Sequence, residues 1–213
     1  MELGDAYQQQ LTHWRATLDS GAHRLGWKIG LNPAPVQAKL GLSRPVVGHL
    51  TSATLVGADG SHSLAGATAP KAEPEIAIEI GPDKTIAGLA PAIELVDIPA
   101  LPGGPDEVGD VVASNIFHRA VAIGSSKRVD SLDGARMTFS VDCRVVAEAD
   151  VSDYPIADMI HAVADTLEEA GERLEAGDRI IAGALIPPPD VEGGQRLTLD
   201  LGSLGAIEVQ LSA

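Results

Sequence analysis

The sequence predicts an α+β fold in which a core dominated by β-sheet carries few helices. From residue 46 to residue 213, most of the chain consists of short apolar stretches separated by Gly, Pro, Asp and Ser, a pattern typical of strands and turns. Two segments, about 3–20 and 155–170, instead repeat apolar residues at helical spacing. With 213 residues, 45% of them hydrophobic, one domain spanning 1–213 is expected, with enough apolar side chains for a core.

The amino-terminal part of the chain is predicted to form a helix, a strand and a short helix. The first helix follows from apolar residues spaced along one face: Leu3, Tyr7, Leu11, Trp14 and Leu18. Residues 25–31 alternate as in a strand, which places Lys28 between two glycines and on the face opposite Trp27. Asn and Pro follow, as is typical of a helix start, and this short helix is expected to end near Leu40.

The rest of the chain is predicted to consist of strands interrupted by one long helix. Five apolar residues define the buried face of this helix over 155–170: Ile156, Met159, Ile160, Val163 and Leu167. A strand over 179–185 is expected after it. The stretches 99–105 and 187–189 are rich in Gly or Pro and are expected to be loops.

The charge balance excludes several classes of partner. Thirty acidic against fifteen basic residues give a formal charge of -15, which repels phosphate backbones and anionic lipid headgroups. We therefore expect neither a nucleic-acid nor a membrane partner. No apolar run approaches the length of a membrane span and the start of the chain is acidic, so a cytoplasmic protein is expected. Cys143 is the only cysteine, which rules out an internal disulfide, and it is expected to be an inert core residue.

Three glutamates form a candidate metal site. If 71–80 is a strand, its isoleucines share one face while Glu73 and Glu75 share the other, about 7 Å apart along the strand. Glu94 lies within an apolar run, where an ionised side chain needs a partner. Such oxygen ligands suit Mg²⁺ or Mn²⁺. The alternative is a solvated acidic face on an edge strand, which Pro74 would also fit.

Lys28 and His118 are the candidate catalytic side chains. Lys28 lies in a strand that is predicted to be buried, and burial disfavours its charged form unless an anion restores it. It is either a proton-transferring amine, a lysine whose amine reaches solvent at a sheet edge, or the partner of a core carboxylate. His118 and His49 are each either catalytic or hydrogen-bonded structural residues. Glycine-rich nucleotide loops and the Gly-x-Ser-x-Gly motif are absent.

Five segments, taken together, resemble a known family. They are 26–31 (Gly-Trp-Lys-Ile-Gly-Leu), 73–77 (Glu-Pro-Glu-Ile-Ala), 91–96 (Pro-Ala-Ile-Glu-Leu-Val), 177–185 (Gly-Asp-Arg-Ile-Ile-Ala-Gly-Ala-Leu) and 201–205 (Leu-Gly-Ser-Leu-Gly). In this order they are similar to segments of the 2-keto-4-pentenoate hydratases and 4-oxalocrotonate decarboxylases of the fumarylacetoacetate hydrolase superfamily. The likeness spans about residues 20–213.

The resemblance implies a fold and an activity. The fold would have a mixed, strongly curved β-sheet core, a β-roll or sandwich, with few flanking helices. Glu73, Glu75 and Glu94 would hold Mg²⁺ or Mn²⁺, and the substrate would be a small 2-keto acid from aromatic catabolism. The expected reaction is the hydration of a 2-hydroxydienoate or 2-keto-enoate through a metal-stabilised enolate, in a homo-oligomeric lyase.

The resemblance also assigns roles to single residues. Lys28 would hold or protonate the enolate, while Asp110 or His118 would relay the other proton. The expected substrate contacts are Gly30, Leu31, Ser114, Asn115, Gly183 and Ala184. The chain departs from the family in reading Ala-Ser-Asn-Ile-Phe at 113–117, where relatives commonly read Ala-Asp-Asn-Ala-Ser, and in having Ala182 where they have threonine.

Other reactions remain as alternatives. The first is decarboxylation of a 4-oxalocrotonate-like 2-keto acid, and the second is another reaction of the superfamily, such as an isomerase or acylpyruvate hydrolase. Carbon–carbon hydrolases of the superfamily use a His-Glu pair, and residues 31–42 contain neither, which ranks hydrolysis lower. A catalytically silent ligand-binding or partner subunit is the non-enzymatic alternative.

Overall fold

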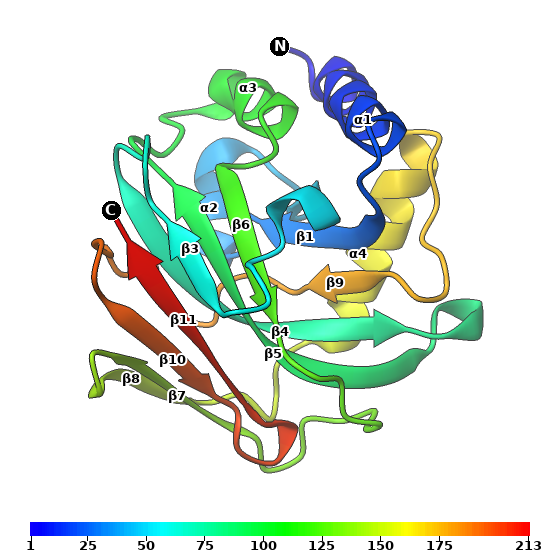
Figure 1. The fold of residues 1–213 in the computed structure, drawn as a ribbon. Helices are drawn as coiled ribbons and strands as arrows, with labels where there is room; N and C mark the ends of the chain where they lie inside the picture. The colour runs from blue at the N-terminus through cyan, green and yellow to red at the C-terminus, as the bar shows by residue number, and fades with distance from the viewer.

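The computed structural model describes residues 1–213 and arranges them as two mixed β-sheets with four α-helices (Figure 1). The helices are α1 (Leu3–Asp19), α2 (Ala34–Leu40), α3 (Val108–Ala113) and α4 (Ile156–Glu169). Single turns of 3₁₀ helix are η1 (Ser52–Thr54), η2 (Pro82–Lys84), η3 (Pro105–Glu107) and η4 (Gly202–Leu204). The six-stranded sheet contains, in spatial order, β2 (Val46–Thr51), β1 (Arg24–Gly30), β9 (Arg179–Ile181), β4 (Pro70–Ile80), β5 (Ile86–Asp97) and β6 (His118–Ile123). The five-stranded sheet contains β3 (Ser61–Ser63), β11 (Ala206–Ser212), β10 (Arg196–Asp200), β7 (Arg136–Val141) and β8 (Arg144–Asp150).

The six-stranded sheet curls strongly, as a half-barrel (Figure 1). Within it β1 runs parallel to β9, and every other neighbouring pair is antiparallel. The side chains of Lys28 on β1 and Glu94 on β5 meet although β9 and β4 lie between these strands, so they meet on the concave face. Small and branched apolar residues fill this face beside them: Leu50, Ala77, Ala90, Ala92, Val121 and Ile181. The predicted α+β fold with a mixed, curved sheet is confirmed.

Strand β4 separates the main core from the concave face. Ile76, Ile78 and Ile80 are buried in the largest hydrophobic cluster, which unites the five-stranded sheet with α4 and the other face of β4. Because successive side chains of a strand alternate, Glu73 and Glu75 point the other way. The alternation predicted from the sequence is confirmed, and one strand supplies both core and site.

Helix α1 closes one side of the half-barrel. The rings of Trp14 on α1 and Trp27 on β1 lie 5.1 Å apart, and the guanidinium of Arg24 stacks on both of them. Arg24 also donates hydrogen bonds to both carboxylate oxygens of Asp178, each at 2.6 Å. Bidentate pairing and stacking suit the planar guanidinium, so this contact fixes α1 against β1 and the turn before β9. The predicted helix over 3–20 is confirmed.

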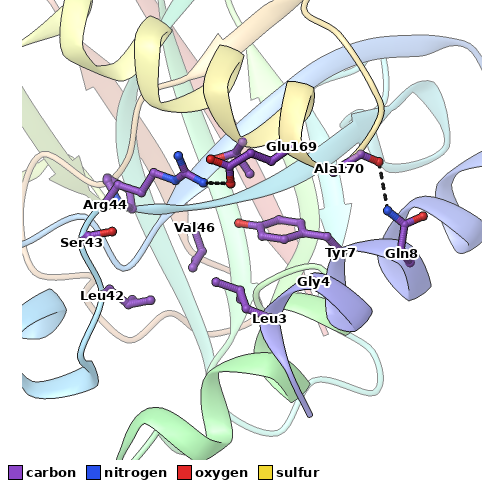
Figure 2. A pocket seen from close by; sticks show the side chains of 12 residues that line it. Leu3, Gly4, Tyr7, Gln8, Leu42, Ser43, Arg44, Val46, Glu169 and Ala170 are labelled. Carbon is purple, nitrogen blue, oxygen red and sulfur yellow. Dashed lines mark hydrogen bonds and ion pairs between the residues drawn. The ribbon is translucent and has the colours of Figure 1, made fainter.

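A second contact joins α1 to α4. Figure 2 shows a small pocket between α1, the loop before β2 and the end of α4. Across it Arg44 forms an ion pair with Glu169, and the Gln8 side chain donates to the carbonyl of Ala170 at 3.0 Å. Helix α4 itself matches the segment predicted at 155–170. None of the helices is both long and apolar enough to cross a membrane.

The expectation that Cys143 is a core residue is wrong. Cys143 is exposed, and together with Asp142 it forms the tight turn between β7 and β8. The φ angles of these two residues are 63° and 51°. A two-residue hairpin turn with both central residues in the left-handed region matches the twist of its strands. The apolar residues on both sides are strand residues, which is why the local sequence suggested a buried position.

Asp97 at the end of β5 provides a pH-dependent contribution to stability. Its carboxylate accepts hydrogen bonds from the backbone of Thr68 at 3.1 Å and of Ala69 at 2.6 Å, which lower its pKa below the ordinary value of 3.8. A carboxyl with a lowered folded-state pKa stabilises the fold above its unfolded pKa and loses this contribution as pH falls through the folded value. We expect Asp97→Asn to destabilise the protein by about 1–2 kcal/mol near neutral pH. Urea unfolding should show that the difference in unfolding free energy between the wild type and Asp97→Asn shrinks below about pH 4. Asp133→Asn, a substitution at an exposed residue, is the control and should leave the unfolding free energy unchanged near neutral pH and below about pH 4.

Candidate metal centre and substrate cleft

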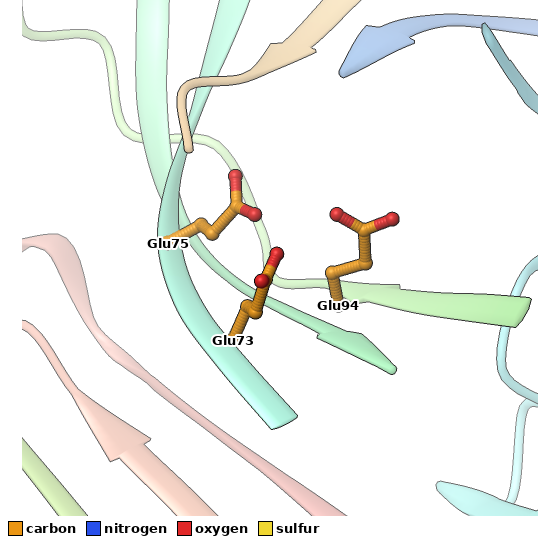
Figure 3. Close-up of side chains that lie close together, drawn as sticks. All are labelled: Glu73, Glu75 and Glu94. Atoms are coloured by element: carbon orange, nitrogen blue, oxygen red, sulfur yellow. The ribbon is translucent and has the colours of Figure 1, made fainter. Parts of the chain in front are cut away.

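Three glutamates converge on the concave face of the half-barrel. In the β4–β5 ladder Glu73 lies directly opposite Glu94, while Glu75 lies two residues further along β4, opposite Ala92. One carboxylate oxygen from each glutamate lies within 4.8 Å of the others (Figure 3). The antiparallel register of β4 and β5 thus brings Glu73 and Glu94 together, although about twenty residues separate them in the sequence.

Two oxygens of this cluster are buried without a partner. Glu75 and Glu94 are both 0% exposed, and neither Oε1 of Glu75 nor Oε2 of Glu94 has a hydrogen-bond partner. The other oxygen of Glu75 accepts a hydrogen bond from the backbone N–H of Gly183 at 2.7 Å. Buried carboxylate oxygens without a partner are costly, and a hard divalent cation is the ligand that such a donor set suits. The residues present therefore fit Mg²⁺ or Mn²⁺, in preference to a metal that requires His or Cys ligands.

The cluster also shifts the pKa values of its members. Burial, and then the charge of Glu94, raises the pKa of Glu73 to about 7. The same two causes, with Glu73 added, raise the pKa of Glu75 well above 4.5. Burial opposes ionisation of Glu94 too, but the charge of Lys28 and the hydrogen bond with His118 outweigh it and lower its pKa. Glu94 is therefore the ionised member, while Glu73 and Glu75 take up protons readily when no cation is bound.

Lys28 is the cation that holds Glu94. Its side chain is 1% exposed, and Nζ lies 2.5 Å from Oε1 of Glu94. Nζ also donates a hydrogen bond to the carbonyl of Ile116 at 2.9 Å. The sequence left open a solvent-reaching lysine, a proton-transferring amine or a core ion pair. The structure contains the core ion pair, and its acid is one of the three clustered glutamates.

His118 lies behind Glu94 and contacts it directly. Its Nδ1 is 2.6 Å from Oε1 of Glu94, and its Nε2 is 2.8 Å from the hydroxyl of Thr54. Both ring nitrogens therefore have protein partners. This arrangement is typical of a histidine that orients a carboxylate. Sequence reasoning missed Thr54, which lies in the short turn η1 and belongs to no recognisable motif.

A cleft of about 640 Å³ opens beside Glu73. Leu31 and Ala184, two of the predicted substrate contacts, line it together with Glu73. Gly30 and Gly183 precede them in the chain and have structural reasons to be glycine. A Cβ at Gly30 would lie 2.6 Å from the Ile116 side chain, and Gly183 has a φ of +95°. The strand predicted over 179–185 ends at Ile181, because the chain turns at Gly183 to present its N–H to Glu75.

The structure places the other predicted residues elsewhere. Asp110 on α3 has a side chain that is 76% exposed and lies 4.0 Å from the amino group of Met1. Ser114 is exposed and donates to the carbonyl of Val111. The carboxamide of Asn115 forms hydrogen bonds with the backbone of β2. None of the three lines the cleft.

Two further residues, which sequence reasoning missed, support the cleft. The hydroxyl of Tyr154 donates to the carbonyl of Ala182 at 2.6 Å, and Asn32 donates to that hydroxyl at 3.4 Å. Burial and the charge of Glu75 raise the pKa of Tyr154, which keeps the phenol protonated. A lone tyrosine before a helix carries no local signal of this role.

Comparisons with known proteins agree on one family. The chain is 32% identical over 222 residues to 2-keto-4-pentenoate hydratase 2 of Dechloromonas aromatica (strain RCB), which covers 95% of this chain and 83% of that protein. It is 28% identical to a 4-oxalocrotonate decarboxylase of Pseudomonas sp, over 89% of this chain and 79% of that protein. No sequence profile of a protein family matches the chain.

A solved structure shows the same fold. The 4-oxalocrotonate decarboxylase from Pseudomonas putida G7, complexed with magnesium and adipate, aligns with a TM-score of 0.85 and 23% identity, covering 99% of this chain and 86% of that one. The sequence identity to the hydratase and the share of both chains that it covers assign the chain to a family, and the shared fold agrees. This chain belongs to the 2-keto-4-pentenoate hydratase and 4-oxalocrotonate decarboxylase family.

Proposed function

We propose that the protein is a divalent-metal-dependent hydratase of a 2-hydroxydienoate. The observation that carries the proposal is the convergence of Glu73, Glu75 and Glu94, two of them with unpartnered buried oxygens, beside Lys28 and at the edge of an apolar cleft. The three carboxylates would hold Mg²⁺ or Mn²⁺. When bound, the cation supplies positive charge for the two neighbouring oxygens of an α-oxo carboxylate.

Lys28 is the side chain that stabilises the negative charge of the substrate. Three carboxylates and one dication leave a net charge near -1, so an anionic substrate needs a further cation. An ammonium has three N–H donors, and Lys28 uses two of them on Glu94 and on the Ile116 carbonyl. The third remains for the developing negative charge on the C2 oxygen of the substrate. His118 orients Glu94 in this scheme, and Asp110 takes no part.

The proposed reaction balances as the addition of one water. The 2-hydroxy group of 2-hydroxypenta-2,4-dienoate loses its proton while C5 gains one, which leaves a 2-oxo acid with a double bond between C3 and C4. Water then adds across this bond, with hydroxyl at C4 and hydrogen at C3. Negative charge gathers on the C2 oxygen in both steps, and a preorganised donor such as Lys28 stabilises charge of this kind.

The lining of the cleft favours a substrate with an apolar tail. Seven of the cleft residues are hydrophobic, among them Leu31, Ile98 and Leu101. Lys71 is the only cationic side chain in the lining, and its Nζ lies 2.5 Å from Asp190. A decarboxylase acting on a dicarboxylic 2-keto acid would need a cation for the second carboxylate. Lys71 is therefore the one observation that favours decarboxylation as the second candidate.

Ultraviolet absorbance tests the proposal directly. In the presence of Mg²⁺ or Mn²⁺, the absorbance of 2-hydroxypenta-2,4-dienoate should decay as water adds to the conjugated system. Release of carbon dioxide from 4-oxalocrotonate should be slow or absent. No decay of the dienoate, with rapid carbon dioxide release instead, would replace the hydratase by the decarboxylase.

Substitution of Lys71 separates the two candidates further. We expect Lys71→Met to leave kcat/KM for the monocarboxylic dienoate within about threefold of the wild-type value, because no charge of that substrate faces Lys71. Any residual activity on a dicarboxylate should fall about 10–100-fold through loss of a charge-assisted hydrogen bond. Steady-state kinetics on both substrates measures this. An equal large loss on both would contradict the proposed orientation of the substrate tail.

A further inference from the structure

Three consecutive residues at the end of α3 adopt a left-handed backbone. Asn115, Ile116 and Phe117 have φ angles of 62°, 54° and 62°. This region is rare for residues other than glycine and costs most for a β-branched residue such as Ile116. Such a turn persists only if its surroundings hold it.

Asn115 supplies contacts that hold the turn. Its Oδ1 accepts the backbone N–H of His49 at 2.8 Å, and its Nδ2 donates to the carbonyl of His49 at 3.1 Å. The carboxamide thus pairs with β2 as a neighbouring strand would. Gly48 makes room for it, because a Cβ there would lie 2.6 Å from Oδ1 of Asn115 and 2.8 Å from Cγ of Lys28.

The left-handed turn at 115–117 also positions Lys28. The carbonyl of Ile116 is the second acceptor of Nζ, at 2.9 Å, and Lys28 is almost fully buried, so this carbonyl and Glu94 together fix the ammonium. The Ile116 side chain also abuts Gly30 on the same strand as Lys28. Asn115 is thereby linked to the ammonium through one backbone carbonyl.

We propose that Asn115 is a positioning residue, whose carboxamide pins the left-handed turn to β2 so that the Ile116 carbonyl directs the ammonium of Lys28. The inference rests on the proposed function in one respect, that Lys28 acts on the substrate. It replaces the expectation that Asn115 contacts the substrate itself. A displacement of about 1 Å at a reacting group can cost about 10²-fold in rate.

Asn115→Gly tests the carboxamide alone, since glycine adopts a left-handed φ without strain. We expect kcat to fall about 10–100-fold, while KM and the Kd for Mn²⁺ change less than about twofold because substrate and metal ligands are untouched. Asp83→Gly is the matched control: Asp83 is exposed and also has a left-handed φ, of 54°, so the substitution makes the same change in backbone freedom far from the turn. Unchanged kcat in Asn115→Gly would overturn the inference, as would a loss that is shared by Asp83→Gly or accompanied by loss of Mn²⁺ binding.

A second measurement does not depend on turnover. If Asn115 acts through the turn on Lys28, the shift in urea midpoint caused by Asn115→Gly should be smaller in a Lys28→Met background than in the wild type. Equal shifts in both backgrounds would overturn the inference. Failure of the proposed function would look different: the wild type would convert no dienoate, while the coupling between the two residues would persist.

Discussion

Lys28→Met is expected to lower kcat for the dienoate by at least about 10²–10³-fold while leaving the protein folded. The methionine side chain fills nearly the same space on β1, so packing on the concave face is kept. What is lost is the donor that faces the developing charge on the substrate, together with the ion pair to Glu94. Steady-state kinetics, with circular dichroism and thermal melting as the test of folding, measures this.

Lys127→Met is the matched control for this substitution. Lys127 is exposed and its side chain has no hydrogen bond or ion pair, while its backbone pairs with Leu89 and Val129, so the same chemical change there should leave kcat unaltered. A fully active Lys28→Met enzyme would refute the assigned role of the ammonium. A variant that fails to fold would be replaced by Lys28→Gln, for which the same loss of kcat is expected.

Binding of Mg²⁺ or Mn²⁺ is expected to raise the melting temperature strongly. A ligand that binds only the native state stabilises it by about 2.7 kcal/mol at one hundred times its Kd, which is roughly 5–11 °C for a chain of this length. Glu75→Gln should abolish most of the shift, since it removes a buried ligand. Glu79→Gln, on the same face of β4 but outside the cluster, should keep it. An unchanged shift in a variant lacking all three clustered glutamates would reject the site.

The size of this shift should depend on pH. Without a cation, the raised pKa values of Glu73, about 7, and of Glu75 mean that the folded state binds more protons than the unfolded state above pH 4.5. The free energy of unfolding of the metal-free protein therefore falls as pH rises from the unfolded pKa through about 7. A bound cation replaces these protons and removes the decline. Melting temperatures with and without Mn²⁺ should diverge between about pH 5.5 and pH 8; parallel curves would contradict the cause assigned to the shifts.

Strand alternation explains why much of the site could be predicted. The period of two placed Glu73 and Glu75 opposite the isoleucines of β4, and the apolar run around Glu94 signalled an acid in need of a partner. Lys28 stood out for the same reason, as a charge inside an apolar strand. In each case the local sequence places a charged residue among apolar ones, and the fold supplies the partner that the charge needs.

Turns and register explain what could not be predicted. Ile116 and Phe117 hold left-handed conformations that nothing in their local sequence favours, so the turn that joins Asn115 to β2 could not be predicted. Cys143 occupies a hairpin turn for which its neighbours gave a strand-like pattern. Thr54 meets His118 only because distant segments fold together. These positions are fixed by tertiary contacts, to which local propensity contributes little.

Strand β4 has a consequence for how the proposed activity can diversify. Its isoleucines are embedded in the main core while Glu73 and Glu75 lie on the opposite face, so a change of the strand that displaces these candidate ligands would also disturb the core. Residues 98–101 and 184–188, by contrast, shape the cleft from loops. Substitution of these loop residues can therefore change the shape of the cleft without moving the glutamate cluster, and variation among descendants of this chain should concentrate there.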